Sequence, residues 1–128
     1  MLFIPFTFRG SPGKVFIKDI NYITNEGRKI CIDTVNDTVC FYGCIDSAVT
    51  PVLDERFHKC HGRLIINFTL VDEFETDGVR FYNGKRIKIG INNLRRARAQ
   101  YRKYIERTAL KMIGERKNKY IHMPNGVK

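Results

Sequence analysis

Apolar and polar residues alternate along much of the first two-thirds of the chain, and the apolar positions are rich in β-branched and aromatic side chains. Alternation with a period of two is the pattern of half-buried β-strands. In the first part of the chain we predict strands over four segments, residues 2–8, 14–23, 28–35 and 38–43. Turn residues separate these segments at 10–13, 25–27 and 36–37. The strands are therefore expected to form antiparallel hairpins.

The pattern changes after Cys44, where apolar residues recur at helical spacing. The apolar residues expected to face the core are Ala48, Val49, Val52 and Leu53. Asp46 or Ser47 is the expected N-cap, and Pro51 limits the segment to a short helix.

A second β-rich region follows this short helix. Residues 63–75 are predicted to form a strand with a polar break at Asn67. The dipeptides Asp77-Gly78 and Asn83-Gly84 predict two hairpin turns, because Gly and Asx residues tolerate the positive φ angles that tight hairpins need. The chain is thus predicted to be nearly all β up to this point.

Residues 93–117 predict a long amphipathic helix, since they contain no Pro and a single Gly, Gly114. Its apolar stripe consists of Leu94, Ala97, Tyr101, Ile105, Thr108 and Met112. Its other faces carry Arg95, Arg96, Arg98, Arg102, Lys103, Arg107, Lys111, Arg116 and Lys117. Residues 121–128 are expected to be a flexible tail. The predicted fold class is mostly β, with one short internal helix and a long basic C-terminal helix.

The positive charge of the chain is concentrated in its last third. Residues 1–84 carry 9 Lys/Arg against 11 Asp/Glu, whereas residues 85–128 carry 14 against 2, and the whole chain has a net charge of +10. This distribution favours a polyanionic partner, either nucleic acid or an anionic membrane surface. The alternative is a basic helix that is merely solvated. With 128 residues, of which 43% are hydrophobic, the chain fits one globular domain.

The N-terminal segment is apolar, but Pro5 and Arg9 interrupt it and no basic residue precedes it, so it is not predicted to be a signal peptide. No apolar run approaches the roughly 20 residues of a membrane span. A cytoplasmic location is therefore expected. In that setting the four cysteines are expected to be free thiols and not disulfide partners.

Patterns typical of metal binding or catalysis are weak. The residues of suitable type for zinc are Cys40, Cys44, Cys60 and His61. Their spacing is looser than that of a zinc knuckle, so no metal site is predicted. Cys60, between Lys59 and His61, is the one candidate for a reactive thiol. Because the chain has no phosphate-binding glycine loop, nucleophile elbow or metalloprotease motif, we expect no enzyme, no cofactor and no small-molecule substrate.

Residues 56–67, RFHKCHGRLIIN, form the most distinctive motif. The motif begins with an aromatic residue, Phe57, and a basic-x-His unit, Lys59 and His61. The pair Gly62-Arg63, a short apolar run at 64–66 and Asn67 follow. A short helix precedes this motif, and an Asx-Gly hairpin and the segment KRIKIGINNLRRA follow it. Together these features resemble the LytTR DNA-binding domain of bacterial transcription regulators over residues 3–98. They are most similar to the quorum-sensing, accessory-gene-regulator branch of response regulators.

The resemblance implies an elongated arrangement of short antiparallel sheets that meets the major groove of double-stranded DNA with three loops. The residues it assigns to the DNA contact are Asn25, Arg28 and Lys29 in the first loop, Lys59, His61, Gly62 and Arg63 in the second, and Asn92, Asn93, Arg95 and Arg96 after the last strand. Arg28, the pair Gly62-Arg63 and Asn92 correspond to the base-reading positions. The chemistry fits, because Arg pairs with guanine, Asn pairs with adenine, and Lys and Arg hold phosphates.

Two positions depart from the family pattern. Gly62 stands where family members present a side chain to DNA, and Asn92 stands where close relatives have Arg, so a different target sequence is expected. His61 has two expected roles, a hydrogen bond that fixes its loop or a direct DNA contact. Asn67 is expected to cap the backbone and not to read bases.

The resemblance divides the chain into a LytTR-like domain, 1–98, and a basic helical extension, 99–120. LytTR regulators usually carry a receiver domain in front, for which the chain has no room, so a stand-alone regulator or a separated domain is expected. The extension is expected to dock on the domain, to pair with a second copy on repeated half-sites, or to lie along the DNA backbone. The rival hypotheses are an RNA- or ribosome-associated basic protein and a membrane-surface or partner-binding protein.

Overall fold

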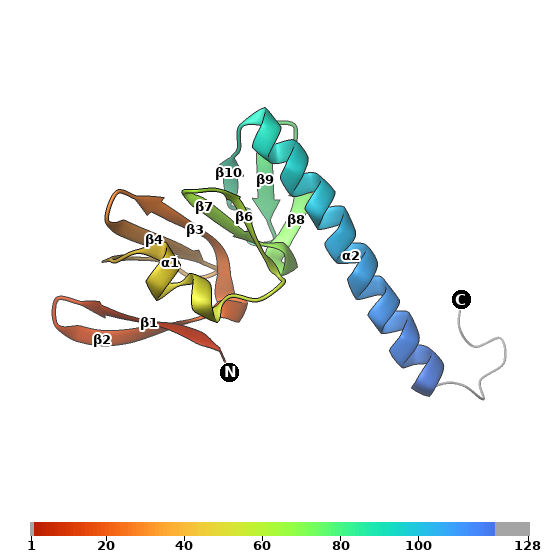
Figure 1. The fold of residues 1–128 in the computed structure, drawn as a ribbon, viewed down its shortest axis with the longest axis horizontal. Helices are drawn as coiled ribbons and strands as arrows, with labels where there is room; N and C mark the ends of the chain where they lie inside the picture. The colour runs from red at the N-terminus through yellow and green to blue at the C-terminus, as the bar shows by residue number, and fades with distance from the viewer. Residues whose placement is uncertain (1, 120–128) are drawn as a thin grey trace.

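The computed structural model describes residues 2–119, with side chains as far as residue 114. Within this part of the chain, ten strands form three antiparallel sheets, and a long helix follows the last strand (Figure 1). The strands are β1 (Phe3–Phe8), β2 (Ser11–Phe16), β3 (Ile20–Glu26), β4 (Lys29–Thr34), β5 (Thr38–Tyr42), β6 (Phe57–His61), β7 (Leu64–Asn67), β8 (Val71–Phe74), β9 (Gly78–Phe81) and β10 (Arg86–Lys88). The helices are η1 (Ile17–Asp19), α1 (Ile45–Ala48), η2 (Thr50–Val52), η3 (Phe68–Leu70) and α2 (Ile91–Lys119). The predicted tail at 121–128 lies outside the described residues.

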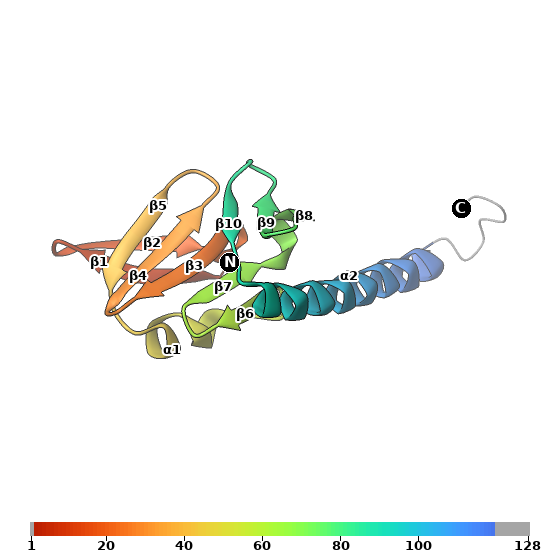
Figure 2. The same cartoon turned by 90° about the horizontal axis from the view of Figure 1, so that it is seen from above.

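The three sheets differ in size and place. β1 and β2 form a hairpin, the central sheet has the order β5-β4-β3-β7-β6, and the third sheet has the order β10-β9-β8. Figures 1 and 2 show α2 beginning beside the third sheet, with its second half extending away from all sheets. None of the helices in the described residues is long and apolar enough to cross a membrane.

The first hydrophobic core lies between the β1–β2 hairpin, one face of the central sheet and the segment from α1 to η2. Its buried residues are Ile4, Val15, Ile17, Ile20, Ile23, Ile30, Ile32, Phe41, Ile45, Val49 and Ile65. The ring of Phe6 stacks on that of Phe41 with 5.5 Å between the centroids. This stacking fixes the hairpin against the central sheet.

The second core lies between β6 and β7, the three-stranded sheet and the first turns of α2. Its buried residues are Cys60, Leu64, Ile66, Phe68, Val71, Val79, Phe81, Ile89, Leu94 and Ala97. β7 joins the two cores, because Ile65 points into the first and Leu64 and Ile66 point into the second. Burial on both faces explains why Leu64, Ile65 and Ile66 are all apolar and do not alternate with polar residues.

Two glycines are required by the hairpin β9–β10. A Cβ at Gly78 would lie 1.9 Å from the carbonyl oxygen of Ile87, so a side chain at this position clashes with the backbone. Gly84 has a φ of +89°, which places it in the left-handed region where glycine is favoured. The predicted turn at Asn83-Gly84 is therefore confirmed, and the chain passes from β9 to β10 there.

The predicted fold class, mostly β with one short and one long helix, is confirmed. Several boundaries are wrong. The first turn lies at Arg9-Gly10, where both φ angles are positive, and residues 11–13 belong to β2. The predicted strands 14–23 and 63–75 are interrupted by η1 and η3. The N-cap of α1 is Cys44, which makes no side-chain hydrogen bond, instead of Asp46 or Ser47.

The long helix is confirmed, but it begins at Ile91, two residues before the predicted start. Leu94 and Ala97 are buried, and Tyr101 and Tyr104 pack against the second core. The helix is continuous through residue 98, so the predicted division between domain and extension falls within it. That division stays a prediction.

The prediction of four free thiols is wrong for two of the cysteines. Cys31 and Cys40 are disulfide-bonded between β4 and β5. They are direct partners in the antiparallel register, which brings their side chains together on one face of the sheet. Cys44 and Cys60 are free.

Candidate nucleic-acid interface

The loop between β3 and β4 presents the first predicted group of residues. Gly27 forms the turn with a φ of +63°, and Arg28 and Lys29 are exposed beside it. The carbonyl oxygen of Arg28 accepts a hydrogen bond of 2.8 Å from the amide of Gly43, so the loop is fixed against the end of β5. The backbone is held while the two cationic side chains face solvent.

The loop between β6 and β7 presents the second group. Nδ1 of His61 accepts a hydrogen bond of 3.1 Å from the backbone amide of Arg63. In the neutral ring, the proton is then carried by Nε2, which can donate to a partner outside the loop. Gly62 and Arg63 are exposed, and a Cβ at Gly62 would meet no atom within 4 Å. His61 therefore fixes its loop, as one of its two expected roles requires.

The second loop contacts the end of β3, directly beside the first loop. The backbone amide of Asn25 donates a hydrogen bond of 3.1 Å to the carbonyl oxygen of Arg63. The contact follows from the register of β3 and β7, in which Thr24 pairs with Leu64. Arg28 and Arg63 thus extend from adjacent loops at one end of the central sheet.

The third predicted group lies in the first turn of α2 and not in a loop. Leu94 donates its backbone amide to the carbonyl oxygen of Gly90, which closes the first helical turn and places Asn92 and Asn93 inside the helix. Oδ1 of Asn93 accepts a hydrogen bond from the Arg96 guanidinium. The loop prediction for Asn92 is therefore wrong, because the helix begins earlier than its apolar stripe indicates.

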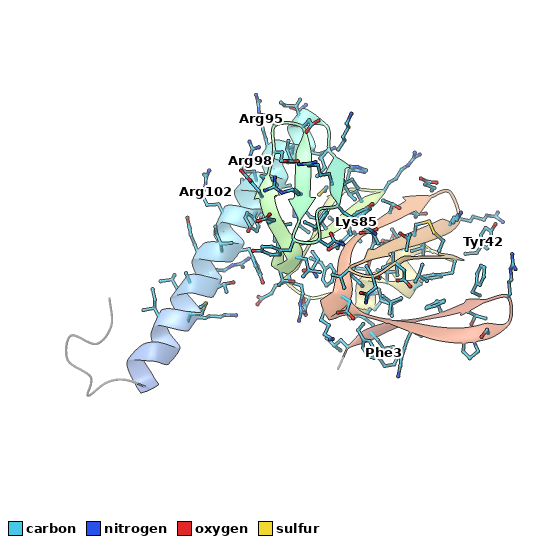
Figure 3. All side chains as sticks on the ribbon, turned by 180° about the vertical axis from the view of Figure 1, so that it is seen from behind. Phe3, Tyr42, Lys85, Arg95, Arg98 and Arg102 are labelled. Carbon is cyan, nitrogen blue, oxygen red and sulfur yellow. A yellow bond between two sulfur atoms is a disulfide. The ribbon has the colours of Figure 1, made fainter. Side chains whose placement is uncertain are left out.

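The three groups line one side of the molecule. In Figures 1 and 2, the β3–β4 loop, the β6–β7 loop and the start of α2 follow one another along that side. The remaining predicted cations are exposed, and Figure 3 shows Arg95 on the outer surface of α2. Lys59 lies 3.6 Å from the Asp46 carboxylate on α1, so its charge is partly balanced.

Asn67 is a structural residue, as predicted. It is fully buried, and its Oδ1 accepts hydrogen bonds from the backbone amide and the hydroxyl of Thr69 at 3.0 and 2.7 Å. Its Nδ2 donates to the carbonyl oxygen of Ile20 at 2.8 Å. One amide group therefore caps η3 and ties it to the start of β3.

Cys60 does not have the environment of a reactive thiol. It is 6% exposed among the apolar residues of the second core, and burial raises the pKa of its thiol to about 12. A thiolate is needed for nucleophilic or redox chemistry, so burial suppresses both. No group of three metal-ligating side chains occurs in the described part of the chain.

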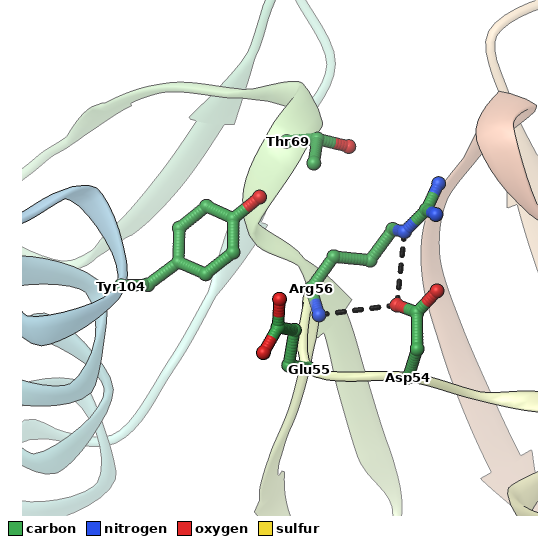
Figure 4. A pocket seen from close by; sticks show the side chains of 5 residues that line it. All are labelled: Asp54, Glu55, Arg56, Thr69 and Tyr104. Atoms are coloured by element: carbon green, nitrogen blue, oxygen red, sulfur yellow. Dashed lines mark hydrogen bonds and ion pairs between the residues drawn. The ribbon is translucent and has the colours of Figure 1, made fainter. Parts of the chain in front are cut away.

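A hollow of about 520 Å³ separates α2 from the segment that leads into β6 (Figure 4). It is lined by Asp54, Glu55, Arg56, Thr69 and Tyr104. Oδ1 of Asp54 accepts from both the backbone amide and Nε of Arg56, at 3.1 and 2.9 Å. At its rim, Nζ of Lys111 lies 3.2 Å from the Glu55 carboxylate. The Lys111–Glu55 ion pair links the second half of α2 to the segment that leads into β6.

The family model of the LytTr DNA-binding domain matches residues 13–102. The chain belongs to the LytTR family. No curated protein sequence matches it. Among solved structures, the LytTR chain is similar to one described as the LytTr DNA-binding domain of a methyl-accepting/DNA response regulator from Bacillus cereus. The sequence identity is 13%, the TM-score is 0.64, and the similarity covers 78% of this chain and 96% of that chain.

The structural similarity confirms the LytTR fold of this chain. Family membership makes the chain a DNA-binding domain with DNA as its partner, and LytTR is a family of DNA-binding domains and not of enzymes. The family match begins at residue 13, so β1 and the turn at Arg9-Gly10 precede it.

Proposed function

We propose that this LytTR protein is a transcription regulator that recognises promoter DNA in a sequence-specific manner through its loops. The observation that carries the proposal is the pair of adjacent exposed loops bearing Arg28 and Arg63. The hydrogen bond from Asn25, near the end of β3, to Arg63 holds the second loop beside the first. A guanidinium can form two hydrogen bonds with O6 and N7 of guanine in the major groove. Two such groups on a fixed backbone can read two positions of one site. In this role the protein acts in the cytoplasm of a bacterium.

The start of α2 supplies the third contact. Backbone amides in the first turn of a helix lack intrahelical partners, and they favour an anion such as a phosphate. Asn92 is exposed there and can pair with adenine, while Lys29, Lys59, Arg95 and Arg96 can hold phosphates on either side. His61 retains a second role through Nε2, and Gly62 brings the backbone close to the duplex.

In vitro selection from a random duplex library tests the proposal. A single enriched motif is expected, and the chain should bind it more tightly than random duplex at physiological salt. Equal affinity for the two duplexes would contradict sequence specificity. A structured RNA included as competitor decides the remaining alternative, since preference for that RNA would favour an RNA-associated protein.

Two copies of the chain are proposed to bind neighbouring half-sites. The second half of α2 extends beyond the domain and exposes apolar side chains, with 44% of Ile105, 51% of Met112 and 49% of Ile113 accessible. Burial of this stripe against a second copy would stabilise a pair on DNA. Sedimentation of the complex with one or two half-sites measures the stoichiometry. Substitution of Ile105 and Met112 by Gln should abolish any cooperativity between half-sites.

A further inference from the structure

A groove lies between the β1–β2 turn and the neighbouring ends of β4 and β5. It has a volume of about 390 Å³ and is lined by Thr7, Phe8, Arg9, Lys29, Cys40, Phe41 and Tyr42. Two of these side chains are cationic, and none is acidic. Part of the groove belongs to residues that precede the family match. The groove is therefore basic and partly aromatic.

The two cations of the groove are free to bind an anion. Within the described residues, the ion pairs of the chain do not include Arg9, Arg28 or Lys29. Arg9 is held at a φ of +52° in the tight turn, and its guanidinium lies 5.1 Å from the ring centroid of Phe8. The turn thus presents a charged side chain at a position where Gly or Asn is favoured. The positive φ of Arg9 is unfavourable for a residue with a Cβ, so the turn is less stable than it would be with Gly or Asn at this position, yet the residue present is a cation.

Aromatic side chains stand beside these cations. Tyr42 is 84% exposed, and Phe8 is 52% exposed. Tyr42 pairs with Lys29 across β4 and β5, while its neighbour Phe41 points into the first core. An exposed ring with a hydroxyl next to a cation can pack on a deoxyribose and donate to a phosphate.

The groove is continuous with the proposed DNA-binding loops. Lys29 lines the groove and, as the first residue of β4, directly follows the β3–β4 loop. The backbone amide of Gly43, which follows Tyr42, donates to the carbonyl oxygen of Arg28. In Figures 1 and 2, the β1–β2 turn continues the row formed by the β3–β4 loop, the β6–β7 loop and the start of α2. Figure 3 shows Tyr42 at the same end of the molecule as this turn.

We infer that this groove is a further contact surface for duplex DNA, which receives the sugar-phosphate backbone beside the base pairs that meet Arg28. Arg9 and Lys29 bind phosphates, and Tyr42 packs against the sugar between them. The inference rests on the proposed binding through the loops. It extends the DNA footprint past the family-matched residues, onto the β1–β2 hairpin.

Arg9→Asn tests the inference without disturbing the hairpin, because Asn-Gly is the favoured pair for this type of turn. On the selected site with long flanks, the variant should bind several-fold more weakly, and the slope of log K against log salt should fall by about one. Arg9→Lys should restore most of the affinity, and Tyr42→Ala should weaken binding more than Tyr42→Phe. Lys18→Ala removes the same charge in η1, which follows the end of the hairpin opposite its turn, and should leave affinity unchanged.

Shortening the duplex locates the contact. Trimming one flank of the site should make Arg9→Asn and the unaltered protein bind equally, whereas trimming the other flank should preserve their difference. Equal binding of the two proteins on the long duplex, or a difference that survives both trims, would overturn the inference. Arg28→Ala and Arg63→Ala are measured in parallel. If they bind as the unaltered protein does, the proposed loop binding fails; if only Arg9→Asn has no effect, the groove alone is excluded.

Discussion

Nζ of Lys85 lies 2.6 Å from Oδ1 of Asp33, which connects the β9–β10 hairpin to β4 of the central sheet. Asp33 is 4% exposed, and its other contacts are the amide of Asn21 at 3.0 Å and the hydroxyl of Thr38 at 3.3 Å. The carboxylate on β4 is thus surrounded by donors from two strands, β3 and β5, and from the β9–β10 hairpin. This polar cluster joins the two parts of the domain where their hydrophobic cores separate.

Loss of the Lys85 ammonium should lower the stability of the fold. Lys85→Met leaves the buried carboxylate of Asp33 with fewer donors, and we expect a loss of about 1–3 kcal/mol in the free energy of unfolding. Urea denaturation measures it. Lys88→Met, at an exposed position of the same hairpin, is the control and should change stability by less than about 0.5 kcal/mol. Similar losses for the two variants would argue against a stabilising role of the cluster.

Arg63→Ala should reduce affinity mainly for the selected DNA site. If the guanidinium forms two hydrogen bonds with a guanine, the loss is about 1–3 kcal/mol on that site and much smaller on random duplex. Fluorescence anisotropy with both duplexes measures the difference. Equal losses on the two duplexes would assign Arg63 to the phosphate backbone.

Gly62→Asn should fold normally and change the preferred DNA sequence. The space around a Cβ at this position is open, and Gly62 does not have a positive φ, so no strain is expected. The new amide would stand in the β6–β7 loop between His61 and Arg63, where it can pair with a base edge. Repeating the selection with this variant tests the prediction. An unchanged motif together with an unchanged melting temperature would show that position 62 does not face the bases.

Removal of the Lys103 and Arg107 charges should weaken binding to every duplex and reduce the salt dependence. These residues are exposed and lie on the same face of α2 as Lys111. Lys111 forms an ion pair with Glu55, so this face of the helix is directed toward the segment that leads into β6. The variant with both residues replaced by Gln is compared with the control Arg102→Gln. Arg102 lies on the face of α2 where the Arg98 guanidinium donates to the carbonyl oxygen of Glu75. A salt slope that responds to Arg102 and not to the pair would place the duplex on the other side of the helix.

The stability of the protein should fall as the pH is lowered from 7.5 to 5.5, in part through His58. Its ring stacks on Phe68 with 5.5 Å between centroids, and burial lowers the pKa of its imidazole below the usual 6.5. The unfolded state then binds the proton more readily, so the contribution is complete above about 6.5 and is lost as the pH falls through the lower pKa of the folded state. In urea denaturation, His58→Gln should show a smaller decrease over this range. An equal decrease for the variant and the unaltered protein would contradict this contribution of His58.

The sheets were predictable because alternation and turn residues are local signals. The Asn83-Gly84 turn and the strand that contains Ile30 and Ile32 follow directly from them. The single-turn helices η1 and η3 were not predictable, since three residues are too few for a helical period. β6 was missed as a strand because its sequence, FHKCH, has few apolar positions to alternate.

The sequence motif could propose residues for the candidate site but could not indicate the contacts among them. The motif identified His61 and Arg63. The hydrogen bond from Asn25 to Arg63 depends on the pairing of β3 with β7, and its two residues are 38 positions apart in the chain (63 − 25), so no local pattern indicates it. Cys31 and Cys40 are equally distant from the observed turn at residues 34–37, whereas the predicted turn at 36–37 lies closer to Cys40 and does not indicate the disulfide. The exposed Tyr42 also follows from alternation, because its neighbour Phe41 is a core residue.

The hydrogen bond from Asn25 to Arg63 limits the ways in which the proposed DNA specificity of this protein can change by mutation. Both partners are backbone atoms, so the bond persists whatever side chains occupy the two loops. Under the proposed function, the spacing between the two base positions that the loops would contact is a property of the fold. The identity of each base would depend on the side chains at positions 28 and 63. Regulators built this way would therefore diverge by changing which bases they recognise, while the number of base pairs between the recognised positions stays the same.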